Sequence, residues 1–456
     1  MVQQVGDFLT PMTLLKETIR PAIYKGAAYH CLSYSQGQYV PDGAMAVDAA
    51  GKIVAFGTWA DVQTQIDVTA FELIELGKHR VIIPGLIDMH VHLPQMEARG
   101  CQADDLLSWL EKYIFATEMK FSDDDHAREI SAWFFEELLA HGTTTAAVFL
   151  TSHTSATNIA FEEAQAHGNR VIMGLNLMDK NAPDALLRPA AELLKDTENL
   201  CARWHGVDDD RLMYAWMPRF AITSTEELLE GVGKLRQQYP DVYFHTHLSE
   251  QVPELDAVKK IFPWADHYTH VYDRFGMLAP KSILAHGIYL SNAELDRIDN
   301  TQCGLAHCPS SNFFLKSGRF PWFKIAGRNT RFGLGSDVGA GPSLNMFEVM
   351  RDAQYTQQEQ VIPFNALLYS ATLGAAYALH LDDKIGNFTP GKEADFVILD
   401  LMGIDPLADT PEALKEHLTR IPYLADAYGV SATAVRGRLL YQKPASGLAL
   451  AALARS

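Results

Sequence analysis

The sequence has 456 residues, of which 48% are hydrophobic and 21% are charged, the balance of an ordinary globular protein. It carries 38 Lys and Arg against 56 Asp and Glu, so its formal net charge is −18. This acidic balance argues against nucleic-acid and anionic-membrane partners, because both attract basic surfaces. The length exceeds one small core and predicts either a large barrel with additions or two to three domains.

The cysteines and the first residues indicate a reducing, cytoplasmic setting. Five cysteines are too few and too scattered for a disulfide framework. Charged residues and a proline, among them Asp7, Pro11 and Arg20, interrupt the first thirty residues, which hold no apolar run of signal-peptide type. No uncharged apolar stretch reaches the roughly 18 residues needed to span a bilayer.

The N-terminal flank has an all-β pattern. Strand-like residues at Ala44–Val47 and Lys52–Phe56 surround the turn Asp48-Ala49-Ala50-Gly51, and more follow at Phe71–Ile74. These segments contain too few apolar residues to close a core alone.

The central region alternates apolar, strand-like runs with amphipathic helical stretches, the pattern of parallel strands with crossover helices. The predicted strands are Val81–His92, Thr143–Thr151, Arg170–Met178, Leu212–Arg219, Val242–Glu250, Ile283–Leu290, Cys303–Pro309 and Arg331–Asp337. A helix is predicted over Asp123–His141, ended by Gly142. Capping boxes at Ser224-Thr225-Glu226-Glu227 and Ser291-Asn292-Ala293-Glu294 open two more. Eight such units over about 300 residues predict an α/β fold of the (β/α)₈, or TIM, barrel type.

The C-terminal flank returns to the all-β pattern at Glu393–Leu399 and at Ala434–Tyr441, the latter with Gly437 in its middle. We predict that both termini form one small β-sandwich domain, from residues 1–80 and 385–456, beside a barrel at residues 81–384. The alternative is separate hairpins attached to the barrel. The tail from Ala445 to Ser456 is mildly apolar and is a candidate for a short helix.

The first chemical signal is Pro84-Gly85-Leu86-Ile87-Asp88-Met89-His90-Val91-His92. Residues two apart in a strand face the same side, so His90 and His92 can both point into the barrel at its carboxyl end. Imidazoles placed in this way are suited to sharing one divalent metal ion. Alone, this pair is a weak signal, since two histidines in a wet strand end would look the same.

Other titratable residues fall at further strand ends. His247 and Glu250 lie near the end of the fifth predicted strand, His286 in the sixth and Asp337 at the end of the eighth. Barrel strands converge at their carboxyl ends, where catalytic groups gather. Asp337 can bind a metal and accept a proton from water, Glu250 can protonate a substrate ring nitrogen, and His286 can orient the water. His245, on the face of His247, is more consistent with a packed or supporting histidine than with a ligand.

Several motifs, in their order along the chain, resemble the amidohydrolase superfamily and, within it, the guanine deaminase family. The superfamily motifs are PGLIDMHVH, HTHLSE, LAHG, AHCPSSN and GLGSDVGAG. The narrower likeness is carried by Leu107-Ser108-Trp109-Leu110, His141-Gly142-Thr143-Thr144-Thr145, Met178-Asp179-Lys180-Asn181-Ala182-Pro183 and Pro218-Arg219-Phe220. One departure is Phe115-Ala116-Thr117-Glu118, where the resemblance leads us to expect a proline.

The resemblance implies a zinc-dependent hydrolase, an aminohydrolase acting on a cyclic amidine C–N bond. It implies one zinc ion per subunit on His90, His92, His247 and Asp337, with Glu250 as proton shuttle and His286 beside the water. Strand four ends Trp216-Met217-Pro218-Arg219-Phe220, without the metal-bridging lysine of many binuclear relatives. This difference favours one metal ion and deaminase chemistry. A homodimer is also implied.

The family's guanine contacts correspond to Gln95, Arg219 and Phe220. Arg219 can donate to a purine O6 or N7, Gln95 can pair with a ring edge, and Phe220 can stack on the heterocycle. Without the resemblance, a strand-end salt bridge for Arg219 and a core position for Phe220 are equally good interpretations. Trp109 either lines the pocket or packs in the core of its loop helix, and the second is slightly favoured.

The resulting hypothesis is a guanine deaminase of purine catabolism. Water activated by zinc loses a proton to Asp337 and attacks C2 of guanine while Glu250 protonates N3, giving xanthine and ammonia. Within the same chemistry, another purine, a pterin or a triazine is an alternative substrate. A non-catalytic binding or scaffold barrel is the alternative from another class, and it would be expected to have lost metal ligands.

Overall fold

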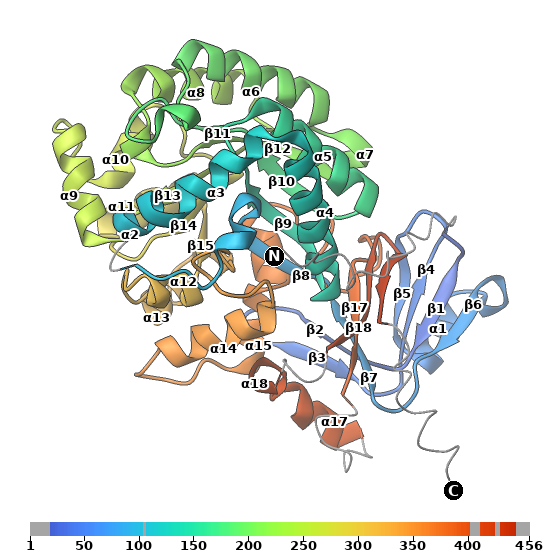
Figure 1. The fold of residues 1–456 in the computed structure, drawn as a ribbon. Coiled ribbons are helices and arrows are strands. Elements are labelled where there is room, and N and C mark those ends of the chain that lie inside the picture. The colour runs from blue at the N-terminus through green and yellow to red at the C-terminus, as the bar shows by residue number, and fades with distance from the viewer. Residues whose placement is uncertain (1–18, 104–105, 402–410, 425–428, 444–456) are drawn as a thin grey trace, which may run out of the picture.

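The computed structural model describes residues 19–103, 106–401, 411–424 and 429–443. The helix predicted at residues 445–456 lies outside these ranges. Figure 1 shows a barrel ringed by helices beside two further sheets. Within the described residues, no helix has both the length and the apolar character needed to cross a membrane.

The barrel has eight parallel strands, as the sequence predicts, and a short ninth strand on its sheet. In spatial order they are β16 (Arg331–Leu334), β15 (Gly304–His307), β14 (Ser282–His286), β13 (Tyr243–Leu248), β12 (Leu212–Pro218), β10 (Arg170–Gly174), β9 (Thr143–Phe149) and β8 (Leu86–His92). The extra strand β11 (Asn176–Leu177) pairs with β12. Beyond β16 the ring is drawn together by two backbone hydrogen bonds to β8, from His92 N to Val338 O at 2.8 Å and from Asp337 N to His90 O at 2.8 Å.

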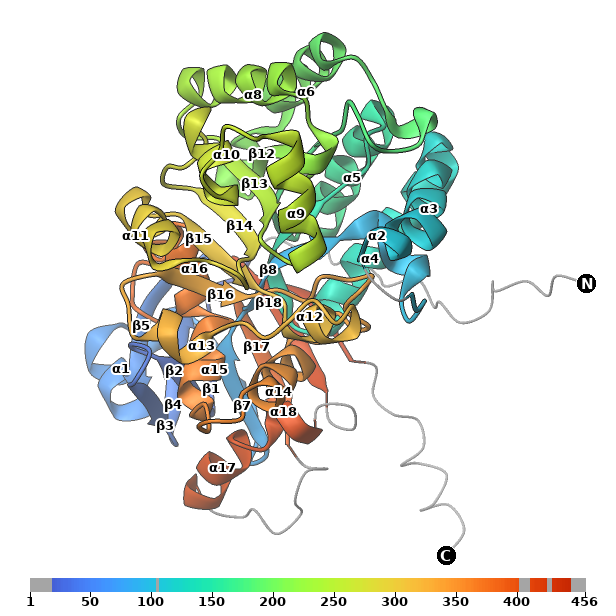
Figure 2. The same cartoon turned by 90° about the vertical axis from the view of Figure 1, so that its left-hand side faces the viewer.

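Helices surround this barrel (Figure 2). They are α2 (Leu106–Trp109), α3 (Phe115–Met119), α4 (Asp124–Ala140), α5 (Thr154–His167), α6 (Ala190–Trp204), α7 (Val207–Asp210), α8 (Glu226–Gln238), α9 (Val252–Ile261), α10 (Tyr268–Arg274), α11 (Asn292–Thr301), α12 (Pro309–Phe314), α13 (Trp322–Ala326), α14 (Met346–Thr356), α15 (Phe364–Ser370) and α16 (Leu373–Ala378). Beyond the barrel lie α1 (Trp59–Gln65), α17 (Pro411–Leu418) and α18 (Ile421–Leu424).

Terminal signals were predicted for three helices, and those of two helices are confirmed. Asp123 caps α4, and Gly142 follows that helix with a φ of 81°, a conformation that favours glycine. Ser291 opens α11 with the expected capping box. The box predicted at Ser224 is wrong: Thr225 caps α8 alone, accepting from Leu228 N, so the helix begins one residue later. The Ser224 hydroxyl instead donates to Phe220 O at 3.1 Å.

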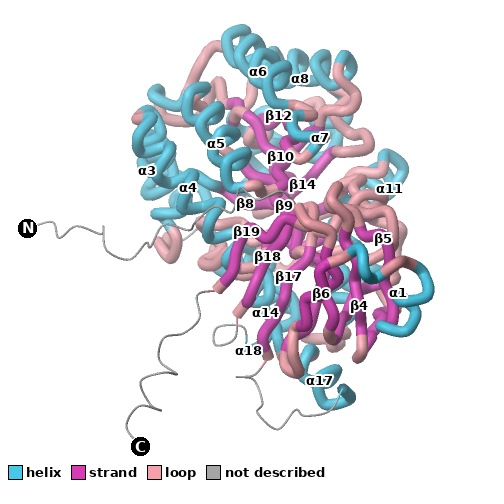
Figure 3. Tube along the Cα trace, turned by 90° about the vertical axis from the view of Figure 1, so that its right-hand side faces the viewer, coloured by secondary structure: helices cyan, strands magenta, loops and turns pink. Residues whose placement is uncertain are grey.

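The flanks form two packed sheets, visible below the barrel in Figure 3. One sheet, of N-terminal residues, has the order β5 (Ile53–Thr58), β4 (Gly43–Val47), β1 (Ala22–Lys25), β6 (Glu72–Glu75). The other joins both flanks in the order β19 (Arg438–Gln442), β18 (Val430–Val435), β17 (Phe396–Asp400), β7 (Arg80–Pro84), β2 (Ala27–Cys31), β3 (Gly37–Val40). Side chains of both sheets share a core, in which the rings of Tyr24 and Phe396 lie 4.7 Å apart. The β-sandwich from both termini is therefore confirmed, and separate hairpins are excluded; the exact domain limits stay predictions.

Three predicted strands are each divided in the structure. The run Val81–His92 is β7 in the sandwich followed by β8 in the barrel, separated by Gly85, whose N–H donates to Asp395 O at 2.9 Å. The segment Ala434–Tyr441 is a hairpin of β18 and β19, because Arg436 and Gly437 adopt positive φ angles of 49° and 68°. The run Arg170–Met178 breaks into β10 and β11. The first two divisions fall at Gly85 and at Gly437, whereas β10 and β11 keep one direction, since both run parallel to β12.

Candidate active site

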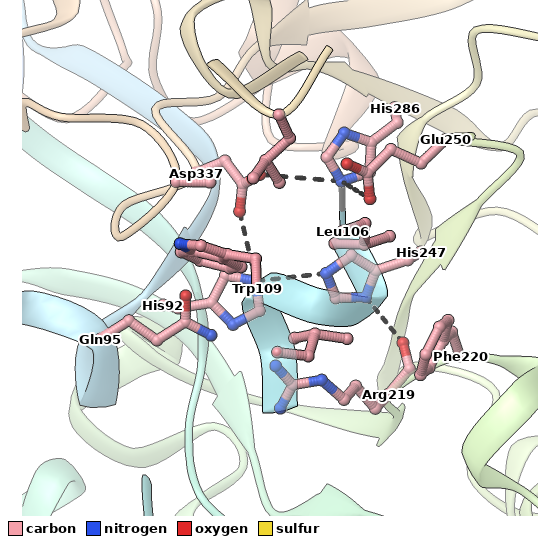
Figure 4. Close-up of a pocket in the computed structure, with 13 residues that line it drawn as sticks. His92, Gln95, Leu106, Trp109, Arg219, Phe220, His247, Glu250, His286 and Asp337 are labelled. Carbon is pink, nitrogen blue, oxygen red and sulfur yellow. Dashed lines mark hydrogen bonds and ion pairs between the residues drawn. The ribbon is translucent and has the colours of Figure 1, made fainter. Parts of the chain in front are cut away.

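The predicted histidines and carboxylates gather at the carboxyl end of the barrel, and Figure 4 shows five of them, His92, His247, Glu250, His286 and Asp337. His90 and His92 lie on β8, His247 on β13 and His286 on β14. Glu250 follows β13, and Asp337 follows β16 at a positive φ of 50°. The period-2 spacing of the strands and the convergence of their ends bring these residues together.

The Nε2 atoms of three imidazoles and one carboxylate oxygen lie close together. His92 Nε2 lies 3.2 Å from His90 Nε2 and 3.2 Å from His247 Nε2. Asp337 Oδ1 lies 3.2 Å from His90 Nε2 and 3.3 Å from His92 Nε2. Two tetrahedral ligands of one zinc ion, each at ~2.0–2.1 Å from the metal, stand about 3.3 Å apart. The donor spacing therefore fits one small divalent cation.

The ionisation of these groups suits a metal. Burial is the largest effect on the histidines, lowering the pKa of His92 to about 3 and that of His247 well below its usual value. Burial alone would raise the pKa of Asp337, but His90 and the other nearby imidazoles outweigh it and hold that pKa well below its usual value. Neutral imidazoles and an ionised carboxylate are the forms that bind metal ions.

His286 belongs to the edge of this group. Its ligand atom lies within 4.8 Å of those of His90, His247 and Asp337. However, His286 Nε2 stands 3.8 Å from Asp337 Oδ2 and only 3.4 Å from Glu250 Oε2. The shorter distances of His92 favour His92 as the third imidazole ligand and leave His286 facing Glu250.

Supporting groups hold the far nitrogens of these rings. His245 Nε2 is 2.8 Å from His90 Nδ1, which places His245 behind the ring of His90, as expected of a supporting histidine. His247 Nδ1 is 2.7 Å from the backbone oxygen of Arg219. His286 Nδ1 is 2.8 Å from the amide oxygen of Asn312. Such contacts fix ring orientation and tautomer.

Asp88 is a further supporting residue that sequence reasoning missed. Its Oδ1 accepts from Ser336 N at 2.9 Å and from His90 N at 3.1 Å, and the Ser336 hydroxyl donates to Oδ2. Complete burial raises the pKa of Asp88 to about 6, despite these hydrogen bonds. The side chain thus ties β8 to the segment that carries Asp337. Asp88 lies two residues before His90, but this spacing alone does not distinguish a supporting residue from an ordinary residue of the core.

Glu250 is placed to hold a proton. Burial and the nearby charge of Asp337 raise its pKa to about 8. The Ser317 hydroxyl donates to Oε1 at 2.8 Å, while Oε2 faces His286. This raised pKa favours the protonated form of Glu250, with one oxygen held by Ser317 and the other beside the histidine cluster.

The three expected substrate contacts lie in the same pocket. Its walls are formed by His92, Gln95, Leu106, Trp109, Leu110, Arg219, Phe220, His247, Glu250, His286, Leu315, Asp337 and Ala340. Gln95, Arg219 and Phe220 are each at most 4% exposed. The favoured interpretation of Trp109 needs correction, because its side chain lines the pocket as well as being buried, anchored by Nε1 donating to Cys101 O at 2.8 Å.

Arg219 also forms the salt bridge considered as its alternative. Its Nη1 lies 2.8 Å from Oε1 and 2.8 Å from Oε2 of Glu118, which is completely buried. Gln95 Nε2 donates to the same carboxylate at 3.0 Å. Sequence reasoning did not select Glu118, because it comes from α3, outside every barrel strand.

The sequence and the fold of this chain are similar to those of known proteins. A model of the amidohydrolase family matches residues 81–440. Guanine deaminase of Escherichia coli (strain K12) is 39% identical over 412 residues, covering 89% of this chain and 92% of that protein. The crystal structure of guanine deaminase from Bradyrhizobium japonicum has a TM-score of 0.87 and 33% identity, covering 93% of this chain and 100% of that one. Guanine deaminase from C. acetobutylicum, solved with bound guanine in the active site, has a TM-score of 0.85 and 27% identity, covering 92% and 100%.

Proposed function

The chain belongs to the amidohydrolase family, and from that premise we propose that it hydrolyses guanine at C2 to xanthine and ammonia. The observation that carries the proposal is a single pocket that brings Glu250 and the cluster of histidines and Asp337 together with Arg219 and Gln95. The naming of its relatives as guanine deaminases, one of them solved with bound guanine, supports this substrate.

The residues that would hold one zinc ion are His90, His92, His247 and Asp337. When bound, zinc lowers the pKa of a water molecule toward ~7 and so supplies a nucleophile near neutral pH. The end of β12, at Met217 and Pro218, offers no lysine to bridge a second ion. The complete ligand set argues against the alternative of a non-catalytic barrel.

Arg219, Gln95 and Phe220 would bind the purine. The Arg219 guanidinium donates to an acceptor edge such as O6 or N7, and the Gln95 amide can both donate and accept. The Phe220 ring lines the same pocket, with its centroid 6.3 Å from that of the His247 ring. This placement would direct C2 and N3 of guanine toward the histidines and Glu250.

The proton transfers balance with two carboxylates. Asp337 accepts one proton of the attacking water, and Glu250 gives its proton to N3 as the water oxygen bonds to C2. Asp337 then returns its proton to the exocyclic amine, the C2–N bond breaks and ammonia leaves. Glu250 recovers the remaining hydroxyl proton, which leaves C2=O and N3–H in xanthine. His286, held by Asn312, orients the water between the two carboxylates.

The first test is a substrate panel with Glu250→Gln. We expect the wild-type protein to release ammonia from guanine in preference to 8-oxoguanine, adenine, cytosine and pterins. Glu250→Gln should retain its zinc, measured by metal analysis, while kcat falls about 10²- to 10⁴-fold. No activity on guanine with strong activity on another base would overturn the substrate, and undiminished turnover in the variant would overturn the role of Glu250.

The remaining properties are finer proposals. We propose a cytoplasmic homodimer acting in purine catabolism, with no nucleic-acid partner. The net charge of −18 supports the last point, because polyanions repel an acidic surface. Light scattering on the purified protein tests the subunit number.

A further inference from the structure

Glu118 is a completely buried carboxylate for which the proposed proton transfers have no use. It lies on α3, in the segment between β8 and α4, directly behind two residues that line the pocket, Gln95 and Arg219. Both of its oxygens contact Arg219 Nη1 at 2.8 Å, and Oε1 accepts from Gln95 Nε2 at 3.0 Å. One carboxylate therefore holds both polar residues assigned to the purine.

The first consequence concerns Arg219. Its guanidinium is fixed by Glu118 on one side, and the Phe115 ring lies 5.8 Å from its central carbon. Within the described chain, no acceptor binds its Nη2 group, which stays available to a ligand. Because the charge of Arg219 is balanced by Glu118, the pair offers hydrogen-bond donors without offering a net positive charge.

The second consequence concerns Gln95, whose amide could point either way in an uncharged pocket. Its nitrogen donates to Glu118, and its oxygen accepts from Gly339 N at 3.2 Å. A carboxylate can only accept and a backbone N–H can only donate, so the two contacts select one orientation. Glu118 and the Gly339 N–H together decide which donor and which acceptor Gln95 presents to the pocket.

We propose that Glu118 is a positioning residue that fixes the purine-recognition edge and keeps it electrically neutral, so that the pocket prefers a neutral purine to an ionised one. This inference rests on the proposed function of the same site. It adds a discrimination between substrate and product: xanthine is a stronger acid than guanine and ionises first as the pH rises. The buried carboxylate disfavours that anion and so favours its release.

The test is Glu118→Gln, which keeps the size of the side chain and removes its charge. We expect the KM for guanine to rise roughly 10- to 100-fold, as for the loss of a charged hydrogen bond, with kcat changed much less. In the wild-type protein, inhibition by xanthine should weaken as the pH rises. In the variant, with the charge of Arg219 unbalanced, that weakening should become smaller, the remainder coming from Glu250 and Asp337 in the same pocket, and the ratio of xanthine Ki to guanine KM should fall about tenfold.

Two further variants separate positioning from general damage. Glu97→Gln changes a partly exposed glutamate of the same segment, paired with Lys120 at 3.0 Å, and should leave both readouts unchanged. Glu118→Asp keeps the charge but shortens the reach, so KM should rise while xanthine inhibition keeps its pH dependence. If Glu118→Gln does not fold, the aspartate variant decides, and an unchanged KM in it overturns the proposal.

A double-mutant cycle with Gln95→Ala adds a measure of coupling. If Glu118 acts through Gln95, the double variant should lose less than the product of the two single effects. Independent, multiplicative effects would remove the claim that Glu118 orients the amide.

The outcomes also distinguish this inference from the proposed function. If the wild-type protein deaminates guanine but Glu118→Gln leaves KM and the xanthine pH profile unchanged, the function stands and the role of Glu118 is wrong. If no ammonia is released from guanine, the function fails, and calorimetric binding of xanthine across pH still tests Glu118. Identical pH profiles for wild type and variant, or no xanthine binding by either, overturn it.

Discussion

His245 illustrates how a residue behind a proposed metal ligand can govern the binding of the metal. Its Nε2 lies 2.8 Å from His90 Nδ1, inside the barrel and fully shielded from solvent. An imidazole held in this way keeps its opposite nitrogen aimed at the metal position, and losses of such partners typically cost 10–100-fold in metal affinity.

We therefore expect His245→Leu to bind zinc about 10- to 100-fold more weakly, measured by competition with a chelator of known affinity. The matched control is His307→Leu, which replaces another buried histidine that stacks on Phe320, with ring centroids 4.3 Å apart. The control should lose stability without losing zinc affinity. Equal zinc affinity in His245→Leu and wild type would contradict the supporting role.

Single site residues can be predicted from the sequence where the regular spacing of a strand determines their position. His90 and His92 follow the two-residue period of a strand, and His247, His286 and Asp337 mark the ends of others, so convergence could be inferred. Glu118 could not be found in this way. Its partner Arg219 is 101 residues further along the chain, and α3 belongs to no barrel unit whose register places its side chains.

Gly85 governs the joint between β7 and β8. A Cβ added there would meet Thr144 Oγ1 at 2.1 Å and Thr144 Cγ2 at 2.5 Å. The chain passes here from the sandwich into the barrel, directly below the strand that carries His90 and His92. Only glycine allows the backbone this close to β9.

Gly85→Ala should therefore lower the free energy of unfolding by about 1–3 kcal/mol, the usual cost of overpacking a core. Chemical denaturation followed by fluorescence measures the change. Gly429→Ala is the control, because an added Cβ there has no neighbour within 4 Å. An equally small effect at both positions would show that β7 and β8 can move apart without cost.

Elements were predicted better by type than by boundary. All eight barrel strands could be located, since apolar runs bounded by helix signals are distinct. The division of Val81–His92 could not, because residues on both sides of Gly85 are buried and the run stays apolar. The hairpin at Arg436-Gly437 escapes prediction for another reason, since its turn requires a positive φ at an arginine as well as at the glycine.

The whole molecule is held together by a buried charge network between barrel and sandwich. Arg170, at the start of β10 and completely buried, donates to Glu393 and to Asp395, the latter at 3.2 Å. Arg436 Nε donates to Glu393 at 2.8 Å. Burial alone would raise the pKa of Glu393, but Arg170 and Arg436 outweigh it and lower that pKa to about 2.

This network makes the free energy of unfolding depend on pH. A glutamate with a pKa of about 2 when folded and ~4.3 when unfolded contributes roughly 3 kcal/mol at neutral pH. Because the folded pKa is depressed, this contribution is present above pH ~4.3 and is lost as the pH falls toward 2. Thermal unfolding of wild type and Glu393→Gln should therefore differ most near pH 7 and converge as the pH falls to about 2. A difference that does not change with pH would contradict the assignment.

At the scale of the molecule, the fold class was open to prediction because strand–helix alternation and flanking β patterns differ in period. Which strands of the two flanks pair with one another could not be fully predicted. N-terminal β1, β4, β5 and β6 form their own sheet, whereas β2, β3 and β7 pair toward the C-terminal strands. Such long-range pairing depends on register between segments that share no local signal.

The pairing of β7 with β17 imposes a delay during synthesis of the chain. Pro84 stands opposite Phe396, so the sheet begun by β2 and β7 waits for a strand about 300 residues later. At a synthesis rate of about 5–20 residues per second, that interval lasts roughly 15–60 s. Throughout it, β7 presents an unpaired apolar edge of the kind that invites intermolecular pairing. Production of this protein in a cell should therefore depend on protection of the nascent chain until its last strands emerge.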